Sequence, residues 1–400
     1  MPLSHNVQRV QESVTMQISA KAAQLKREGV DVIALSAGEP DFDTPPNIKN
    51  AAVRAIEDGF TKYTTPSSGI IELKEAICRK FKIDNNLNYG VDEVTVNNGA
   101  KHSLFLAVAA LVNPGDEVII PTPYWVTYSE QPRLVGGVPI IVRTRSENDL
   151  KITPEEFRAA ITSQTRMLFL CSPSNPSGSV YTKAELEDLA QVAVDNNVYV
   201  LSDEIYEKLL YDGVEHHSIA SLGEEIKKLT IVVNGVSKAY AMTGWRIGYA
   251  GADAEVIGGM NKVQMQEVSH PSSISQKAAV EALEGPQNSI EDMRKAFDER
   301  RRYMVDRLNS IEGILCPLPK GAFYAYPDVS AFYGKKAGQF EIRDSIDLCK
   351  YLLEEGRVAC VPGVGFGTEE HIRLSYATSM SLIEDAMDRI QIAFEKLMSE

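Results

Sequence analysis

Residues 230–249 read TIVVNGVSKAYAMTGWRIGY and carry the strongest signal in the chain. The β-branched run at 230–233 predicts a short buried strand. Lys238 therefore follows a strand end in a loop of small residues, which is where open α/β sheets bind their ligands. A lysine that is partly desolvated in such a place can lose its proton and form a Schiff base with a carbonyl compound.

A candidate phosphate ligand follows Lys238 eight positions later. Arg246 lies between Gly244 and Gly248, and its planar guanidinium suits a phosphate group. An amine and a phosphate-binding fork so close together indicate pyridoxal phosphate, because that cofactor needs both. The structural alternative is a surface lysine and arginine in a glycine-rich loop. That alternative would account for a lone lysine, but it explains the whole pattern poorly.

The same stretch resembles the lysine-attachment signature of the class I and II aminotransferases. The matching residues are Gly235, Ser237-Lys238, Ala241-Met242, Gly244 and Arg246-Ile247-Gly248. The resemblance implies that Lys238 carries the cofactor, that Ser237 contacts it and that Arg246 holds its phosphate. It also implies the fold-type I architecture of pyridoxal-phosphate transferases. Gly235 departs from relatives that have a phosphate-binding serine there.

Composition and charge restrict the function classes. The chain has 400 residues, 44% of them hydrophobic, and a net charge of −14, which argues against binding to nucleic acid. Its five cysteines are widely spaced and form no C-x-x-C motif, so we expect reduced thiols in a cytoplasmic protein and no metal site. The longest apolar run, residues 104–112, is too short to span a bilayer, and we see no signal peptide.

The middle of the chain alternates short apolar strands with helical patterns, which predicts a doubly wound, mostly parallel sheet. Each strand leads into an unusual polar or aromatic group, and the carboxyl ends of parallel strands meet at one edge. The expected strands and the groups after them are 93–96 before 97–101, 117–120 before 121–125, 167–170 before 172–178, 199–201 before 202–206, and 230–233 before Lys238.

The pattern changes after Gly285-Pro286. A long amphipathic helix is expected over 290–311, followed by short strands near 322–326, 358–361 and 372–375. These elements indicate a smaller α+β domain completed by the N-terminal segment, where an extended arm precedes a helix between residues 7 and 28. We therefore predict a large domain at 45–285, and a small domain with the N-terminal arm at 1–44 and 286–400.

Two strand ends supply further candidate cofactor ligands. Gly99, Ala100 and Lys101 open a helix directly after a strand, and such a turn presents free N–H groups to a phosphate. Asp203 ends another strand, and a carboxylate that faces the pyridine nitrogen of the cofactor keeps that nitrogen protonated. The hydroxyl of Tyr206, three positions later, would help to tune the pKa of the Schiff base. A helix-capping aspartate with a packed tyrosine is the alternative, but Ser202–Tyr206 matches the family motif.

The remaining site residues are implied by the resemblance. Asn175, in the family's N-P-x-G motif, contacts the cofactor's phenolic oxygen and the substrate carboxylate, and Trp125 stacks on the pyridine ring. Arg373 binds the substrate α-carboxylate, and the backbone of Gly38 approaches it. Tyr63 reaches the cofactor phosphate of a neighbouring subunit, which implies a homodimer with shared active sites.

The chain is most similar to the I-beta branch of aspartate aminotransferases, which includes prephenate aminotransferases. In that branch a lysine of the phosphate-loop helix binds the second carboxylate, and Lys101 matches it. Ser13 and Thr15 are candidates to assist Lys101, and no arginine occurs between residues 250 and 287 to take its place. The resemblance thus implies amino transfer from L-aspartate to 2-oxoglutarate.

There are four alternatives to this function, of which the last is discounted. A prephenate aminotransferase, alone or with aspartate activity, would use the same residues, because prephenate also has two carboxylates. A pyridoxal-phosphate lyase of this fold would release pyruvate or ammonia instead. A non-enzymatic regulator is opposed by the acidic charge, and we find no DNA-binding segment before residue 7. A nicotinamide dehydrogenase would depend on Gly363–Gly367, which lacks the G-x-G-x-x-G spacing.

Overall fold

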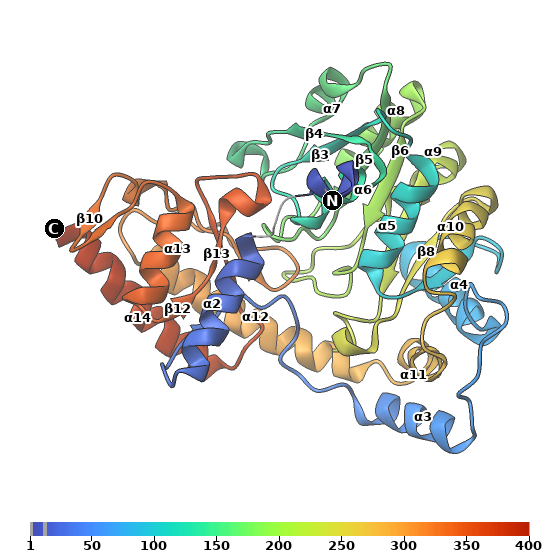
Figure 1. Cartoon of the computed structure of the whole chain (residues 1–400), viewed down its shortest axis with the longest axis horizontal. Coiled ribbons are helices and arrows are strands. Elements are labelled where there is room, and N and C mark those ends of the chain that lie inside the picture. Colours follow the sequence, from blue (N-terminus) through green and yellow to red (C-terminus); the bar gives the residue numbers. More distant parts are fainter. Residues whose placement is uncertain (1–2, 11–13, 400) are drawn as a thin grey trace.

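The computed structural model of the chain describes residues 3–10 and 14–399, and its largest feature is a seven-stranded sheet (Figure 1). The strands lie in the order β2-β8-β7-β6-β5-β3-β4. β8 is antiparallel to both neighbours, and the other pairs are parallel, so the predicted mostly parallel α/β sheet is confirmed. The strands are β2 (Val94–Asn97), β3 (Glu117–Pro121), β4 (Val138–Val142), β5 (Thr165–Cys171), β6 (Tyr199–Asp203), β7 (Thr230–Gly235) and β8 (Gly248–Gly251).

Helices cover both faces of this sheet, because successive side chains of a strand point to opposite faces. In β5, Met167 and Phe169 pack in one hydrophobic cluster with α5 and α10, whereas Leu168 and Leu170 pack in another with α8. The helices are α1 (His5–Gln8), α2 (Val14–Arg27), α3 (Pro46–Glu57), α4 (Ile71–Asn85), α5 (Ala100–Leu111), α6 (Thr127–Val135), α7 (Pro154–Ala160), α8 (Lys183–Asn196), α9 (Glu224–Leu229), α10 (Ala254–Glu267), α11 (Ser273–Glu284), α12 (Asn288–Asn309), α13 (Ser345–Glu354) and α14 (Met380–Ser399).

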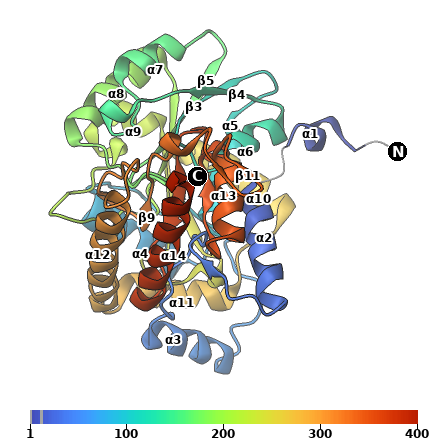
Figure 2. The ribbon, with the colours of Figure 1, turned by 90° about the vertical axis from the view of Figure 1, so that its left-hand side faces the viewer.

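The smaller sheets lie in a second core. β9 (Tyr324–Ala325), β14 (Ile372–Ser375) and β13 (Val361–Pro362) form a three-stranded antiparallel sheet, and β1 (Ile33–Ala34) pairs in parallel with β12 (Val358–Ala359). A short hairpin joins β10 (Lys336–Ala337) to β11 (Phe340–Glu341). α12 and α14 pack side by side here, as Figure 2 shows. Ile18, Val32 and Leu35 share this core, so the N-terminal segment packs with the C-terminal third. The division at residue 285 stays a prediction.

Three sequence expectations need correction. Residues 5–8 form the short helix α1, capped by the Ser4 hydroxyl, and not an extended arm. β4 and β8 were not among the predicted strands. β4 is an edge strand containing Pro139, and β8 contains Gly248, where a Cβ would overlap the backbone of Ala100. β8 has no run of β-branched residues, whereas β4 contains Ile140-Ile141-Val142 and was overlooked. No helix within the described residues is both long and apolar enough to cross a membrane.

Candidate active site

Lys238 follows β7, and its ammonium group donates to the carbonyl of Gly38. The rings of Tyr206 and Phe323 lie 5.9 and 5.8 Å from its Nζ. Burial lowers the pKa of Lys238 to about 8; Arg373 and Arg246 act in the same direction, while Glu39 and Asp203 oppose them. A larger fraction of this amine than of an ordinary lysine is therefore uncharged near neutral pH, as a nucleophile or proton acceptor requires.

Asp203 ends β6 and is buried. Its Oδ2 accepts a hydrogen bond from the Tyr128 hydroxyl at 2.7 Å, and its Oδ1 accepts one from the amide of Ile205 at 3.2 Å. Burial raises the pKa of Asp203 to about 6 in spite of these two bonds. An acid held this way is ready to form an ion pair with a protonated ring nitrogen. Tyr128 was not among the residues predicted from the sequence, although it lies only three positions after Trp125.

The ring of Tyr128 meets the ring of Trp125 edge-on, with their centroids 5.7 Å apart. The ammonium group of Lys101 lies 4.6 Å from the centre of the Trp125 ring. Burial and the neighbouring Arg246 both lower the pKa of Lys101. Trp125, Lys101 and Asp203 therefore line one connected region at the carboxyl edge of the sheet.

Arg246 lies against the turn that precedes α5. Its guanidinium donates to the carbonyls of Thr243, at 2.8 Å, and Asn98, at 3.3 Å. A Cβ on Gly99 would overlap Nη2 of this guanidinium, so only glycine permits the contact. The first amides of a helix have no acceptor within it, and those of Ala100 and Lys101 begin α5 here. An arginine beside a helix N-terminus is a suitable cradle for a phosphate.

Arg373 of β14 is only 4% exposed, and its guanidinium binds two oxygens. Nη1 donates to Asn175 Oδ1 and Nη2 donates to the carbonyl of Ser36, both at 2.9 Å. The ring of Tyr324 lies 4.4 Å from the guanidinium carbon, and Nε has no hydrogen-bond partner among the described residues. A buried cation without an acid partner is costly, so this geometry favours binding of a carboxylate from outside the chain.

Tyr206 and Tyr324 connect the surroundings of Lys238 with those of Arg373. The hydroxyls of Tyr206 and Tyr324 lie 2.8 Å apart, and burial raises the pKa of both. A Cβ on Gly38 would lie 3.3 Å from the Tyr324 hydroxyl, so the Gly38 segment passes close to this pair. Nothing in the sequence pattern marks Tyr324, because its role depends on which residues face it in the fold.

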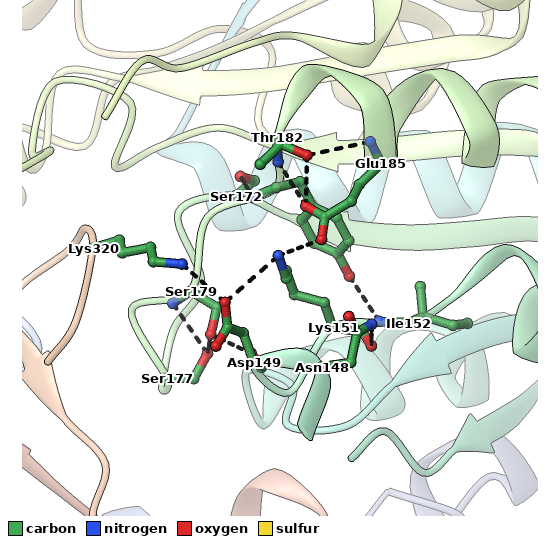
Figure 3. A network of polar contacts seen from close by, with 11 residues as sticks. Asn148, Asp149, Lys151, Ile152, Ser172, Ser177, Ser179, Thr182, Glu185 and Lys320 are labelled. Carbon is green, nitrogen blue, oxygen red and sulfur yellow. Dashed lines mark hydrogen bonds and ion pairs between the residues drawn. The ribbon is translucent and has the colours of Figure 1, made fainter. Parts of the chain in front are cut away.

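The loop that carries Asn175 is held by the polar network in Figure 3. The Ser177 hydroxyl donates to that of Ser179, which in turn donates to the carbonyl of Asp149 at 2.6 Å. The Asp149 carboxylate pairs with Lys320 at 2.9 Å. The amides of Lys320 and Gly321 also donate to the carbonyl of Gly178. These contacts connect the loop of Asn175 to the segment that leads into β9, and so help to hold Asn175 beside Arg373.

The other predicted site residues are placed as follows. Ser237 is buried next to Lys238. Tyr63 is 88% exposed, and its ring meets that of His270 edge-on at 5.6 Å. Ser13 lies outside the described residues, as does the side chain of Thr15. The structure therefore gathers Gly38, Trp125, Asn175, Asp203, Tyr206, Lys238, Arg246, Arg373 and the 99–101 turn, whereas Tyr63 lies on the surface.

Four cations of this site have no carboxylate partner. In the part of the chain that the structure describes, Lys101, Lys238, Arg246 and Arg373 form none of the ion pairs, although many surface lysines and arginines do. These four cations outnumber Asp203 and Glu39, the two carboxylates that act on Lys238, so the site is positive inside a chain of net charge −14. A ligand with several negative groups, such as a phosphate and carboxylates, would neutralise it.

Known proteins resemble this chain in sequence and fold. The family model described as aminotransferase class I and II matches residues 30–390. An aspartate aminotransferase of Bacillus sp. strain YM-2 is 50% identical over 97% of this chain and 98% of its own length. An aspartate/prephenate aminotransferase of Cereibacter sphaeroides is 48% identical over 97% and 98%. The crystal structure of the Rhizobium meliloti aspartate aminotransferase superposes with a TM-score of 0.96, at 45% identity, covering 99% of this chain and all of that one.

Proposed function

Because this chain belongs to the class I and II aminotransferase family, we propose that it is a pyridoxal-phosphate-dependent aspartate aminotransferase. It transfers the amino group of L-aspartate to 2-oxoglutarate and so forms oxaloacetate and L-glutamate. The observation that carries this proposal is the set of four unpaired cations, Lys101, Lys238, Arg246 and Arg373, around the buried Asp203. A cofactor phosphate and the two carboxylates of the substrate match these charges.

The residues at the sheet edge fit pyridoxal phosphate. Arg246 and the 99–101 turn would hold its phosphate, and the buried Asp203 would face its ring nitrogen. Trp125 would cover the ring, while Asn175 and Tyr206 would bind its phenolic oxygen and Ser237 would contact it. When bound, the cofactor supplies an electron sink for the carbanion formed at the substrate α-carbon.

Lys238 is the base in this proposal. Its pKa of about 8 leaves enough free amine to take the proton from the α-carbon, and its protonated form can return one. Nearby Arg373 and Arg246 favour the free amine, which keeps the pKa close to the working pH. Transfer to a second oxo acid reverses these proton movements, so ping-pong kinetics are expected.

Arg373 and Lys101 select the substrate. Arg373, held by Asn175 and stacked on Tyr324, presents its free Nε to the α-carboxylate, beside the backbone of Gly38. Lys101, beside Trp125, binds the distal carboxylate, with Ser13 and Thr15 as proposed helpers. Two fixed cations at opposite ends of the substrate explain a preference for dicarboxylic amino acids.

Prephenate is the second candidate amino-group acceptor. A specific observation favours it: relatives from Cereibacter sphaeroides and Nitrosomonas europaea, 48% and 47% identical, are aspartate/prephenate aminotransferases. Prephenate also has two carboxylates, so Arg373 and Lys101 would serve it without rearrangement. Its product, arogenate, would place the enzyme in amino-acid biosynthesis.

A homodimer with shared active sites completes the proposal. Tyr63 is almost fully exposed and meets the ring of His270, and the exposed apolar side chains of Met265 and Val268 lie a few residues before His270 in the chain. In such a dimer, a second copy of the chain would cover these side chains, and Tyr63 of the first copy would reach the cofactor phosphate bound by the second. The five cysteines are all unpaired, which supports a reducing, cytoplasmic location.

A spectral titration tests the proposed function. The purified protein with pyridoxal phosphate is treated with L-aspartate, and then with 2-oxoglutarate or prephenate. Loss of the visible cofactor absorbance with aspartate and its recovery with 2-oxoglutarate alone would support an aspartate aminotransferase. Recovery with prephenate as well would support the bifunctional enzyme, and no response to aspartate would contradict the proposed substrate.

A further inference from the structure

The two backbone polar groups of Asn98 are both held by side chains. Its amide donates to Nδ1 of His102 at 3.1 Å, and its carbonyl accepts from Nη2 of Arg246 at 3.3 Å. Asn98 immediately precedes Gly99, where the proposed phosphate cradle begins. His102 therefore contacts the opposite side of the segment that Arg246 binds.

The contacts of His102 determine where its proton is. Nδ1 accepts from an amide and so carries no hydrogen, whereas Nε2 lies 3.0 Å from the carboxylate of Glu267 and donates to it. Glu267 is the last residue of α10, so a neighbouring helix fixes this tautomer. The side chain of His102 is only 10% exposed, and its hydrogen bond to Asn98 is partly buried, whereas Glu267 lies closer to the surface.

The turn beside His102 has little freedom to move. The amide of Gly99 donates to the carbonyl of Asn97, and the amides of His102 and Ser103 donate to the carbonyl of Gly99. Gly99 has a φ of +84°, and a Cβ at this position would overlap the Arg246 guanidinium. A small displacement of Asn98 would therefore shift both the guanidinium and the first amides of α5.

We propose that His102 is a positioning residue for the phosphate cradle: by accepting the Asn98 amide, it holds the turn in the geometry that Arg246 and the first amides of α5 need. The proposal rests on the proposed cofactor, because it assigns His102 to the phosphate of pyridoxal phosphate. His102 itself does not contact the ligand and acts through Asn98.

Binding of two ligands to His102 variants tests this role. Affinities for pyridoxal 5'-phosphate and for pyridoxal, which lacks the phosphate, are measured by absorbance titration of the cofactor-free protein. H102L removes the acceptor and is expected to weaken binding of pyridoxal phosphate roughly fivefold to tenfold, with less than about a twofold effect on pyridoxal. H217L, a matched substitution of a half-buried histidine outside the site, is expected to change neither affinity.

Two amide variants separate hydrogen bonding from packing. The Asn side chain of H102N can place its oxygen where Nδ1 lies, whereas the Gln of H102Q reaches toward Glu267 and leaves Asn98 without an acceptor. H102N is expected to bind pyridoxal phosphate within about twofold of the unaltered protein, and H102Q to match H102L. This pair keeps the test decisive if H102L does not fold.

Three results would overturn the inference. These are unchanged affinity of H102L and H102Q for pyridoxal phosphate, equal losses for the two ligands, or a loss in H102N as large as in H102Q. An unaltered protein that binds pyridoxal phosphate no better than pyridoxal would overturn the proposed cofactor, and this inference with it. Tight binding by the unaltered protein together with any of the three results overturns the role of His102 alone.

Discussion

Nη1 of Arg373 lies 2.9 Å from Oδ1 of Asn175, although the two residues are 198 positions apart in the chain. The contact joins a strand of the small antiparallel sheet to the loop after β5, at the edge of the large sheet. It leaves the guanidinium buried, oriented by Tyr324 and without an acid partner among the described residues. The two cores of the molecule thus build the proposed carboxylate site together.

Arg373→Leu is expected to lower kcat/KM for L-aspartate by roughly two to three orders of magnitude, because removing one partner of a buried charged contact costs about 3 to 4 kcal/mol. Steady-state kinetics measure the loss. The control is Arg343→Leu, which removes an exposed arginine paired with Asp347 and should leave kcat/KM unchanged. A loss of less than about fivefold in Arg373→Leu would contradict the assigned carboxylate site.

Lys238→Ala is expected to abolish turnover and the visible absorbance of the bound cofactor, since the covalent amine and the base are lost together. Absorbance spectra and a single-turnover assay with L-aspartate check both effects. Lys262→Ala, an exposed lysine of α10, serves as the control and should keep both. Retained turnover in Lys238→Ala would refute the mechanism.

Lys101→Ala is expected to reduce kcat/KM for L-aspartate at least tenfold more than kcat/KM for an apolar amino acid, because only aspartate loses a charge-assisted contact. Both substrates are measured with the same oxo acid. Equal losses for the two substrates would mean that Lys101 serves the cofactor and not the distal carboxylate.

Gly99→Ala is expected to weaken cofactor binding tenfold or more, because the added Cβ would overlap the Arg246 guanidinium. Gly115→Ala is a well-matched control: Gly115 also has a positive φ, of +92°, but no atom lies within 4 Å of its added Cβ. It should cost only the backbone strain of about 1 to 2 kcal/mol in folding free energy. Titration with pyridoxal phosphate and thermal melting measure the two effects, and equal cofactor affinity in both variants would argue against the cradle.

Asp203→Asn is expected to stabilise the cofactor-free protein above pH 6 while abolishing catalysis. Burial raises the pKa of Asp203 from 3.8 to about 6 in the folded protein, so the folded state binds more protons than the unfolded state between those values. Stability attributable to Asp203 therefore falls as pH rises from about 4 to 6, by about 2 to 3 kcal/mol in total. Thermal melting of both proteins at pH 4, 6 and 8 checks this. If the stability difference between Asp203→Asn and the unaltered protein became smaller as pH rises, the raised pKa of Asp203 would be contradicted.

Much of the architecture could be predicted from the sequence because it depends on local patterns. The β-branched and apolar runs of β3, β5, β6 and β7 predict buried strands, and their alternation with helices predicts a parallel sheet. β4 was missed although Ile140-Ile141-Val142 is such a run, whereas β8 could not be predicted in this way. β8 is the short run GYAG, and it is a strand because β2 and β7 supply hydrogen-bonding partners on both sides.

The candidate site, too, could be predicted only in part from the sequence. The sequence by itself determined the family. It also predicted Lys238 as the attachment lysine, with Arg246 in the same motif, because Lys238 and Asn175 follow strand ends and Asp203 ends a strand in recognisable motifs. Only the tertiary structure decided that Tyr128 binds Asp203, that Tyr324 joins Tyr206 to Arg373 and that His102 supports Asn98. These contacts unite side chains from different elements, and burial then sets their charges. Distance and desolvation are properties of the packed chain, so no local pattern of residues can encode them.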